Sequence, residues 1–311
     1  MLTQLNSDIY YSIGTNKGNI ASVIAAFDLD NTLVRTVKGQ FPKDEHDWKF
    51  LPNRLSTLLA WQNSGAIIVI FTNQGYKGAK LTTALNRINN ILAMLRTDGL
   101  IPWCFVATGP NSPYRKPSNV MWNVFKQYVP SIDLNGSFYC GDAAGRPADH
   151  SADDSGFATA VGLPFYTPEQ IFPRTEVTIP NTQTMFIFVG MPGAGKSTFY
   201  QQQLASRGFV LAQQDLLKTP VKVKAVVQQA LASGKSVAVD GTNPSVERRR
   251  ELLDLAVQYR VPTMIIYFVS DGHGRNKLRT NPVPTIAYSM YYKNLVEPSE
   301  TVDGVPVVEL E

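Results

Sequence analysis

The chain has few of the features that mark secreted or membrane proteins. Its 311 residues include 2 cysteines, which excludes a disulfide framework as the source of stability. Residues 1–14 lack the basic start and apolar core of a secretory signal, and no apolar run approaches the ~20 residues that span a bilayer. We therefore expect a soluble intracellular protein with no membrane partner.

Charge is scarce as well. Charged residues make up 17% of the chain and the net charge is +4, so nucleic-acid binding cannot be argued from total charge and requires local basic patches. Hydrophobic residues make up 44%, which is ordinary for a globular chain and excludes a disordered one. At this length we expect two domains, each large enough to bury its own core.

The most specific motif present is a glycine-rich loop behind an apolar run. Residues 190–198 read Gly-Met-Pro-Gly-Ala-Gly-Lys-Ser-Thr, directly after the run 185–189. A tight loop whose backbone N–H groups face an anion tolerates few side chains, which explains the glycines. The motif predicts a bound nucleoside triphosphate, with a lysine on the β- and γ-phosphates and a serine on Mg²⁺. The predicted nucleotide-binding residues are Gly190, Gly193, Gly195, Lys196, Ser197 and Thr198.

A second candidate phosphate site lies far upstream, where an apolar run ends in two carboxylates. Residues 23–27 lead into Asp28-Leu29-Asp30, and side chains at i and i+2 leave a strand end on the same side. Such a pair can hold Mg²⁺ while Asp28 attacks phosphorus and a protonated Asp30 gives its proton to the leaving oxygen. A polar turn that caps a helix is the simpler alternative for so short a pattern.

Three further polar sites follow apolar stretches along the chain. Thr72 and Asn73 come after residues 66–71, and they can donate hydrogen bonds to phosphate oxygens without adding charge. Lys116 is suited to neutralising the repulsion between an anionic nucleophile and an anionic substrate. Asp142 ends the stretch 137–142 and offers a further oxygen ligand for Mg²⁺. Polar sites in this order at strand ends are hard to explain as core packing.

These motifs resemble those of known phosphatases. Residues 28–32, 71–74, 115–117 and 141–142 are similar to the four motifs of the haloacid dehalogenase-type phosphatases. The resemblance implies that Asp28 is the nucleophile and Asp30 the general acid–base, that Thr72 and Lys116 hold the phosphate, and that Asp142 joins the two aspartates on Mg²⁺. Asp149, Ser151 and Asp154 match a following acidic segment that supports the metal site. Asn31 stands where the family usually has glycine, and asparagine tolerates the positive φ of such a turn.

A closer resemblance covers nearly the whole chain. In the same order along the sequence, residues 71–74, 141–146, 161–165 and 193–198 are similar to the eukaryotic polynucleotide kinase 3′-phosphatase family. The animal members carry an N-terminal phosphopeptide-binding module. Because the nucleophile motif begins at residue 28, we expect no such module here.

The resemblance also assigns the residues of the kinase half that meet the acceptor, the substrate whose hydroxyl receives the phosphoryl group. Asp215 stands where the family has a general base that takes a proton from the attacking hydroxyl, although it could instead cap the following helix. The family tends to have arginine before this residue, whereas this chain has Gln214. Residues 240–244 are similar to the family's Asp-x-Thr-Asn-Pro motif, which places Thr242 and Asn243 at the substrate.

Two basic segments complete the kinase prediction. Residues 248–250 are three arginines that open a helix over 246–259, and alignment with the family makes Arg249 the substrate-phosphate contact. Three adjacent arginines cannot share one helix face, so we expect at least one to be merely solvated. Arg275 and Arg279 occupy the position of the lid of P-loop kinases, where arginine stabilises charge on the transferring phosphoryl group. A plain solvated basic face is the alternative for either one.

The order of segments predicts an α/β fold. Apolar strand runs alternate with helix-length segments such as 81–95 and 222–232, which predicts two doubly wound parallel-sheet domains. We expect a haloacid dehalogenase-like 3′-phosphatase domain over 1–175, a linker over 176–184 and a P-loop 5′-kinase domain over 185–311. In such sheets ligands bind at the carboxyl ends of strands, where every motif lies.

The sequence therefore predicts a bifunctional enzyme for nucleic-acid ends. The first domain would remove a 3′-phosphate through a phosphoaspartate on Asp28 with Mg²⁺, and the second would transfer the γ-phosphate of ATP to a 5′-hydroxyl of DNA, or of RNA. We expect a monomer. One alternative is a metabolite phosphatase fused to a small-molecule kinase, which an apolar closed pocket around Trp103, Tyr114 and Trp122 would favour. Another is a nucleotide-dependent binding protein without catalysis.

Overall fold

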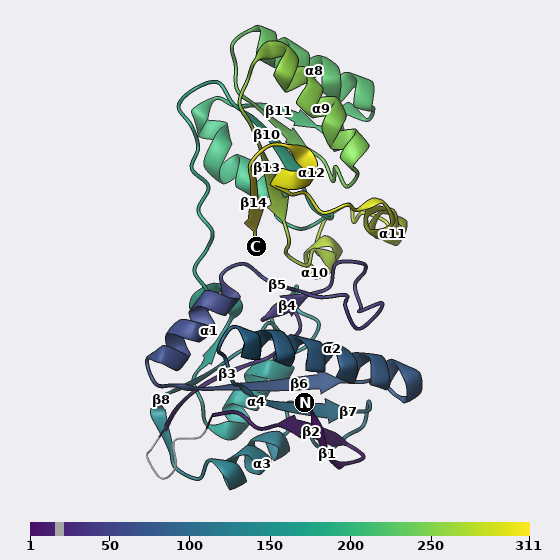
Figure 1. Ribbon diagram of the computed structural model, residues 1–311. Helices are drawn as coiled ribbons and strands as arrows, with labels where there is room; N and C mark the ends of the chain where they lie inside the picture. The colour runs from purple at the N-terminus through teal and green to yellow at the C-terminus, as the bar shows by residue number, and fades with distance from the viewer. Residues whose placement is uncertain (16–21) are drawn as a thin grey trace. The chain divides into compact units, whose positions relative to one another are not determined.

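Each half of the chain is built around a sheet of mostly parallel strands, as Figure 1 shows. The structure, a computed structural model, describes residues 1–15 and 22–311. The chain divides into a first unit, residues 1–173, and a second unit, residues 174–311. The predicted α/β class with parallel sheets is confirmed.

The first unit holds a sheet of seven strands in the order β1-β2-β7-β6-β3-β8-β9. Strands β7, β6, β3, β8 and β9 pair in parallel, while β1 and β2 add an antiparallel edge. A separate two-stranded antiparallel pair, β4 and β5, follows β3. The strands are β1 (Thr3–Asn6), β2 (Ile9–Ser12), β3 (Ser22–Phe27), β4 (Val34–Arg35), β5 (Lys49–Phe50), β6 (Ile67–Gln74), β7 (Trp103–Thr108), β8 (Ile132–Cys140) and β9 (Phe165–Tyr166).

Side chains that alternate along these strands bury both faces of the sheet. In β3, Ala25 and Phe27 join one core with residues of the first two helices, whereas Ile24 and Ala26 join another with residues of the next two. Two apolar faces require helices on both sides, which is why the strands read as continuous apolar runs. The helices are α1 (Arg54–Asn63), α2 (Gly78–Thr97), α3 (Val120–Tyr128), α4 (Asp153–Val161) and the short α5 (Pro168–Ile171).

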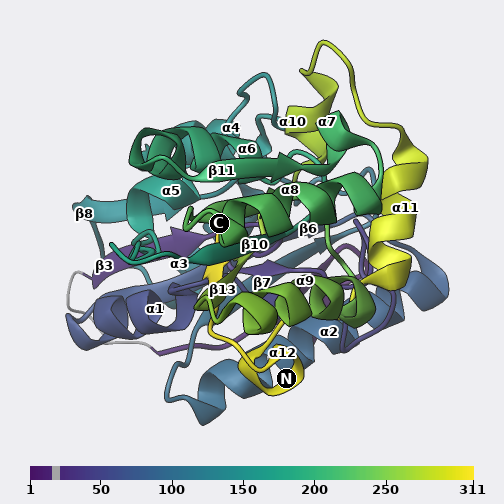
Figure 2. The same cartoon turned by 90° about the horizontal axis from the view of Figure 1, so that it is seen from above.

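The second unit contains a five-stranded sheet that is parallel throughout, in the order β11-β12-β10-β13-β14. Helices α8 and α9 contact each other and the sheet, as the two views in Figures 1 and 2 show, and α6 with its continuation packs on the core that holds Phe186 and Phe188. The strands are β10 (Met185–Val189), β11 (Val210–Gln213), β12 (Val237–Asp240), β13 (Thr263–Phe268) and β14 (Val307–Leu310). The helices are α6 (Lys196–Phe199), extended by the turns η1 (Tyr200–Leu204) and η2 (Ala205–Arg207), α7 (Gln214–Leu217), α8 (Pro220–Ala232), α9 (Val246–Tyr259), α10 (His273–Lys277), α11 (Thr285–Asn294) and α12 (Glu300–Asp303).

Three local expectations can be compared with this fold. Helix α9 has the bounds predicted for it, while α2 extends the predicted segment 81–95 by several residues at its start. The stretch expected as a linker, 176–184, falls inside the second unit, where Val177 and Ile179 pack against that unit's core. Within the described ranges we find no helix with both the length and the apolar character needed to cross a bilayer.

Candidate phosphoryl-transfer sites

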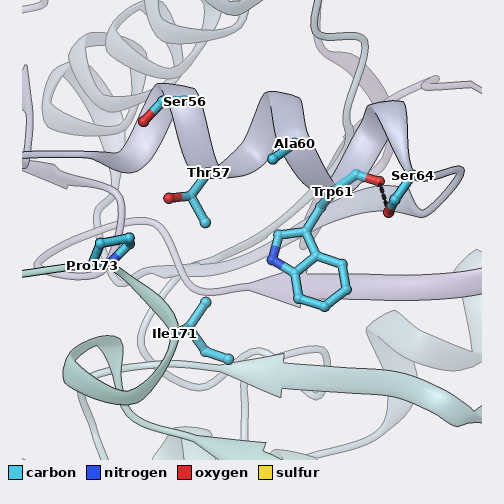
Figure 3. Close-up of a pocket in the computed structure, with 7 residues that line it drawn as sticks. All are labelled: Ser56, Thr57, Ala60, Trp61, Ser64, Ile171 and Pro173. Atoms are coloured by element: carbon cyan, nitrogen blue, oxygen red, sulfur yellow. Dashed lines mark hydrogen bonds between the residues drawn. The ribbon is translucent and has the colours of Figure 1, made fainter.

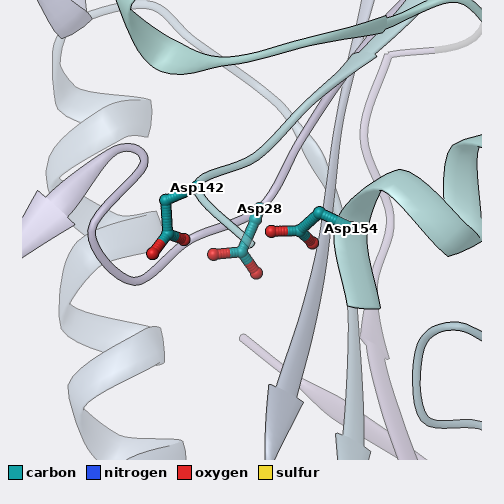
Figure 4. Close-up of side chains that lie close together, drawn as sticks. All are labelled: Asp28, Asp142 and Asp154. Carbon is teal, nitrogen blue, oxygen red and sulfur yellow. The ribbon is translucent and has the colours of Figure 1, made fainter. Parts of the chain in front are cut away.

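Three carboxylates converge at the carboxyl end of the first sheet. Asp28 follows β3, Asp142 follows β8, and Asp154 lies in the first turn of α4. Because β3 and β8 are parallel neighbours, their carboxyl ends meet at one edge. The three residues offer oxygens within 4.8 Å of one another, and Figure 4 shows their carboxylates side by side. Such a set of hard oxygen donors fits a divalent cation.

The ammonium of Lys116 joins two of these carboxylates. Its Nζ lies 2.5 Å from Asp28 Oδ1 and 2.7 Å from Asp154 Oδ1, and it donates to the Tyr139 hydroxyl at 2.9 Å. The side chain is only 3% exposed. A buried charge of this kind requires partners of opposite sign, and here they come from β3 and α4. Lys116 therefore stands beside the predicted nucleophile, as the sequence suggested.

Asn73 holds the backbone of Lys116 in place. The Lys116 N–H donates to Asn73 Oδ1 at 2.9 Å, and Asn73 Nδ2 donates to the Lys116 carbonyl at 3.1 Å. These two bonds turn the side-chain amide of Asn73, which was predicted to bind substrate, toward the backbone of Lys116. Asn73 instead fixes the position from which Lys116 reaches Asp28.

Burial is the main influence on the ionisation of the cluster. Burial raises the pKa of Asp28 to about 7, while the charge of Lys116 lowers it and that of Asp154 raises it. Burial also raises the pKa of Asp142 well above its usual range, and the charges of Asp28 and Asp154 add to this. Burial alone would lower the pKa of Lys116, but the two carboxylates at its ammonium outweigh burial and raise it. One cation thus faces three acids, and the excess negative charge favours a proton or a metal ion.

Asp30 belongs to a different network. Arg87 Nη2 lies 2.6 Å from Asp30 Oδ1, and Gln74 Nε2 donates to Asp30 Oδ2 at 2.8 Å and to Thr72 Oγ1 at 2.9 Å. Both carboxylate oxygens of Asp30 are therefore engaged outside the three-acid cluster. The group of acids that could hold a metal ion thus includes Asp154 and not the predicted Asp30. The charge of Asp30 still acts on the pKa of Asp28, so its predicted role in proton transfer stays a prediction.

Sequence reasoning missed two residues of this site. Arg87 is fully buried in α2, and its Nε and Nη1 have no hydrogen-bond partner in the described part of the chain. Tyr139 donates its hydroxyl proton to Asp154 Oδ1 at 2.9 Å while it accepts from Lys116. A charged residue at a core-facing position of an amphipathic helix is a signal that could have revealed Arg87, since it lies between buried Ala84 and Ile91. Asn31, which stands where the family usually has glycine, adopts a φ of 58°, the positive value that asparagine was expected to tolerate.

The glycine-rich loop connects β10 to α6 at the carboxyl end of the second sheet. Its glycines Gly190, Gly193 and Gly195 all have positive φ, at 151°, 82° and 107°. A Cβ on Gly193 would lie 2.3 Å from the carbonyl oxygen of Gly272, so a larger residue does not fit there. Lys196 Nζ donates to the carbonyls of Gly190 and Met191, both at 2.7 Å. Burial lowers the pKa of Lys196 to about 8.

Charged groups from four segments gather around this loop. Ser197 and Thr198 open α6, and the Ser197 hydroxyl donates to Asp240 Oδ2, at the end of β12, over 2.8 Å. Burial raises the pKa of Asp240. The charges of Asp215 and Arg279 act on the pKa values of both Lys196 and Asp240, so these two exposed side chains lie near the loop. The structure thus brings together the predicted base, one predicted lid arginine and the lysine predicted to bind the nucleotide.

Arg275 lies differently from Arg279. It is exposed on α10, and its charge acts on the pKa of Asp271 but is not among the influences on Lys196. Of the two predicted lid arginines, Arg279 is therefore the one whose charge reaches the phosphate loop.

Two predicted substrate contacts of the kinase half are wrong for this structure. Arg249 is 0% exposed and forms an ion pair with Asp303, with Nε 2.7 Å from Oδ1 and Nη2 3.1 Å from Oδ2. Its Nη1 donates to the carbonyls of Pro244 and Val296, at 2.9 and 3.0 Å. Asn243 is also buried, with Nδ2 donating to the Phe188 carbonyl at 2.8 Å. Both side chains hold the loop after β12 in place and cannot face a substrate.

That loop also contains Thr242, whose side chain is half-buried and whose carbonyl accepts from the N–H of Gly190 at 3.2 Å. Thr242 therefore lies directly beside the phosphate loop, where it was predicted to meet the substrate.

A pocket of about 390 Å³ in the first unit lies apart from the carboxylates (Figure 3). Its lining has hydroxyl groups but no carboxylate, histidine, lysine or cysteine side chain, so the pocket supplies no general base of its own. The aromatic residues that a metabolite pocket would have used are elsewhere: Trp103 and Trp122 are buried in the core of the sheet. The pocket is lined by Ser56, Thr57, Ala60, Trp61, Ser64, Ile171 and Pro173.

Comparison with known proteins places this arrangement in a family. The sequence profile of the family "Polynucleotide kinase 3 phosphatase" matches residues 23–172. A bifunctional polynucleotide phosphatase/kinase of Schizosaccharomyces pombe is 34% identical over 79% of this chain and 67% of its own length. A candidate bifunctional polynucleotide phosphatase/kinase of Acanthamoeba polyphaga mimivirus is 29% identical over 92% of this chain and 84% of its own. A polynucleotide 3′-phosphatase of Arabidopsis thaliana is 34% identical over 50% of this chain and 24% of its own. The chain belongs to the polynucleotide kinase 3′-phosphatase family.

Proposed function

We propose that this chain is a bifunctional enzyme that processes nucleic-acid ends, removing 3′-phosphates in its first unit and phosphorylating 5′-hydroxyls in its second. The observation that carries the proposal is the pairing, in one chain, of a buried aspartate–lysine cluster with a glycine-rich phosphate loop that has its own aspartate base. The names of the relatives describe the same pair of activities. Each unit contributes a complete set of reactive groups, so a monomer suffices.

In the phosphatase reaction, an Asp28 oxygen attacks the phosphorus of the 3′-phosphate while the bond from phosphorus to the sugar oxygen breaks. Asp30, held by Arg87 and Gln74, gives a proton to the leaving 3′-oxygen. Lys116 lies 2.5 Å from Asp28 and offsets the repulsion between the two anions. Water, deprotonated by Asp30, then hydrolyses the aspartyl phosphate and releases inorganic phosphate.

In the kinase reaction, Asp215 takes the proton of the attacking 5′-hydroxyl. That oxygen forms a bond to the γ-phosphorus of ATP while the bond to the β-phosphate bridge breaks and ADP leaves. The positive φ of Gly193 and Gly195 gives the loop the tight turn with which backbone N–H groups can be aimed at phosphates. Lys196 and Arg279 stabilise the charge that moves during transfer.

The donor sets of both sites suit Mg²⁺. In the first unit Asp28, Asp142 and Asp154 would hold it, and in the second Ser197 with Asp240 would do so. When bound, Mg²⁺ draws charge from the phosphate oxygens and helps to orient the phosphoryl group. We propose that the substrate is a DNA end. The experiment described next compares DNA ends with RNA ends.

The test uses an oligonucleotide with a 5′-hydroxyl and a 3′-phosphate, made as DNA and as RNA, with Mg²⁺ and with or without ATP. We expect loss of the 3′-phosphate without ATP, abolished by Asp28→Asn but not by Lys196→Ala. We expect ATP-dependent 5′-phosphorylation that is abolished by Lys196→Ala but not by Asp28→Asn. If neither end changes while an aryl phosphate is hydrolysed, the chain is a phosphatase of small molecules and the assignment to nucleic-acid ends fails.

A further inference from the structure

The three consecutive arginines at the start of α9 point in three different directions. Arg249 turns inward to Asp303, and Arg250 is exposed to solvent with no ion pair or hydrogen bond in the described structure. Arg248 turns toward α7, where its Nη2 lies 3.5 Å from Oε1 of Gln214. Only Arg248 is thus both held in place and open to a ligand.

The side chain of Arg248 is fixed by its surroundings. It is 17% exposed, and its Nη1 donates to Glu251 Oε2 at 3.1 Å, one turn along the helix. Its backbone N–H donates to the Ser245 hydroxyl that caps α9, at 3.2 Å. Lys224 of α8 lies 3.0 Å from the same Glu251 oxygen. Two cations therefore share one carboxylate, which leaves a net positive charge facing α7.

This charge lies beside the acceptor side of the kinase site. Gln214 immediately precedes Asp215, and both follow β11, whose last residue Gln213 pairs in register with Asp240. The charge of Asp215 in turn acts on Lys196 and Asp240. The hydrogen bonds to Glu251 and Gln214 use two of the five N–H donors of Arg248, which leaves donors for an anion.

We propose that Arg248 binds a backbone phosphate of the acceptor strand near the 5′-hydroxyl, next to the base Asp215. The inference rests on the proposed kinase function and adds a residue that recognises the polynucleotide as opposed to ATP. A guanidinium can hold a phosphodiester through two parallel hydrogen bonds. Position 214, next to the base, carries an uncharged amide in this chain. The positive charge for the phosphate therefore comes from Arg248 of α9, which adjoins Gln214 of α7.

The test compares Arg248→Gln with Arg250→Gln in the full chain, using a 5′-hydroxyl, 3′-hydroxyl DNA oligonucleotide and ATP. For Arg248→Gln we expect the KM of the oligonucleotide to rise about tenfold, with the KM of ATP and kcat unchanged. The slope of log KM for the oligonucleotide against log salt concentration should decrease by about 0.7, the value for one lost phosphate contact on a single strand. Arg250→Gln should change neither quantity.

A rescue variant separates direct contact from a structural role. Gln214 adjoins Arg248, so Gln214→Arg in the Arg248→Gln background should restore the charge to the same place and return both KM and the salt dependence toward wild type. An unchanged oligonucleotide KM, or a fall in kcat without a change in salt dependence, would overturn the contact. If the wild-type chain transfers no phosphate to any oligonucleotide, the kinase function itself fails, and the contact with it.

Discussion

The first unit buries the charges that surround its predicted nucleophile, whereas the second buries Lys196 and Asp240 but exposes Asp215 and Arg279. Asp28, Lys116 and Asp154 are all buried and joined by hydrogen bonds within the unit. In the second unit Lys196 is buried, but Asp215 and Arg279 are exposed. A buried site gains strong electrostatic interactions from its low dielectric, at the cost of needing every charge paired.

The difference fits the two reactions. In the proposed phosphatase reaction a group of the protein attacks a single phosphate, so the nucleophile and its lysine can be assembled in advance. The kinase must admit two polyanionic substrates, and charges on exposed segments can meet them from opposite sides. Loss of one partner should therefore damage folding and catalysis together in the first unit, and catalysis alone in the second.

The strongest test of this comparison is Lys116→Met. We expect the 3′-phosphatase rate to fall by about 10⁴-fold or more, because nucleophile and substrate would repel each other without compensation. The first unit should also lose about 3–5 kcal/mol of unfolding free energy, since two carboxylates remain buried without their partner. Steady-state rates and denaturant unfolding measure these effects. Unchanged stability would show that the buried ion cluster does not hold the first unit together.

Arg279→Met examines the exposed site. We expect 5′-phosphorylation to slow by about 10³-fold through the loss of transition-state charge stabilisation, with no change in the unfolding midpoint. Arg275→Met is the matched comparison on the same segment and should have a much smaller effect, because Arg279 is the lid arginine whose charge acts on Lys196, whereas that of Arg275 acts on Asp271. Single-turnover transfer from ATP to a 5′-hydroxyl oligonucleotide measures both. Equal losses would contradict the separate placement of the two arginines.

Arg87→Met tests whether Arg87 positions Asp30. We expect a loss of about 100-fold on a 3′-phosphorylated oligonucleotide, whose leaving alkoxide needs a proton, and less than about threefold on p-nitrophenyl phosphate, whose leaving group does not. Arg87→Lys should recover part of the oligonucleotide rate, since Lys keeps the charge. A similar loss on both substrates would assign Arg87 to structure alone.

The smallest effect concerns Mg²⁺ and pH. The folded-state pKa of Asp28 is raised to about 7, so its contribution to stability is present below its unfolded value, roughly 3.9, and is lost as pH rises through 7. Above that pH the ionised carboxylate is available to a cation. We expect Mg²⁺ to raise the thermal midpoint by a few degrees at pH 8 and by less at pH 5.5.

The matched variants for this measurement are neighbours in α4. Asp154→Asn should remove most of the shift caused by Mg²⁺, while Asp153→Asn, one residue away and outside the cluster, should retain it. A shift that is equal at the two pH values would mean that the cation binds elsewhere.

Several elements could be predicted because they depend on residues close in sequence. The phosphate loop, the Asp28–Asp30 pair and helix α9 follow from local patterns of glycine, charge and apolar spacing. The parallel sheets follow from strand runs that are apolar throughout, since both faces must be covered. Asp154 was noticed only as part of an acidic segment, and its place beside Asp28 depends on how α4 packs against β8.

By itself, then, the sequence determined the fold class and the chain's family and predicted which groups react, because these inferences rest on local motifs. Only the tertiary structure decided which side chains meet. It turned Arg249 toward Asp303 and Arg248 toward Gln214, separated Asp30 from the cluster of Asp28, Asp142 and Asp154, and paired Asn73 with the backbone of Lys116. Neighbouring side chains on one helix or strand point in different directions, and which direction leads to a partner depends on elements distant in sequence.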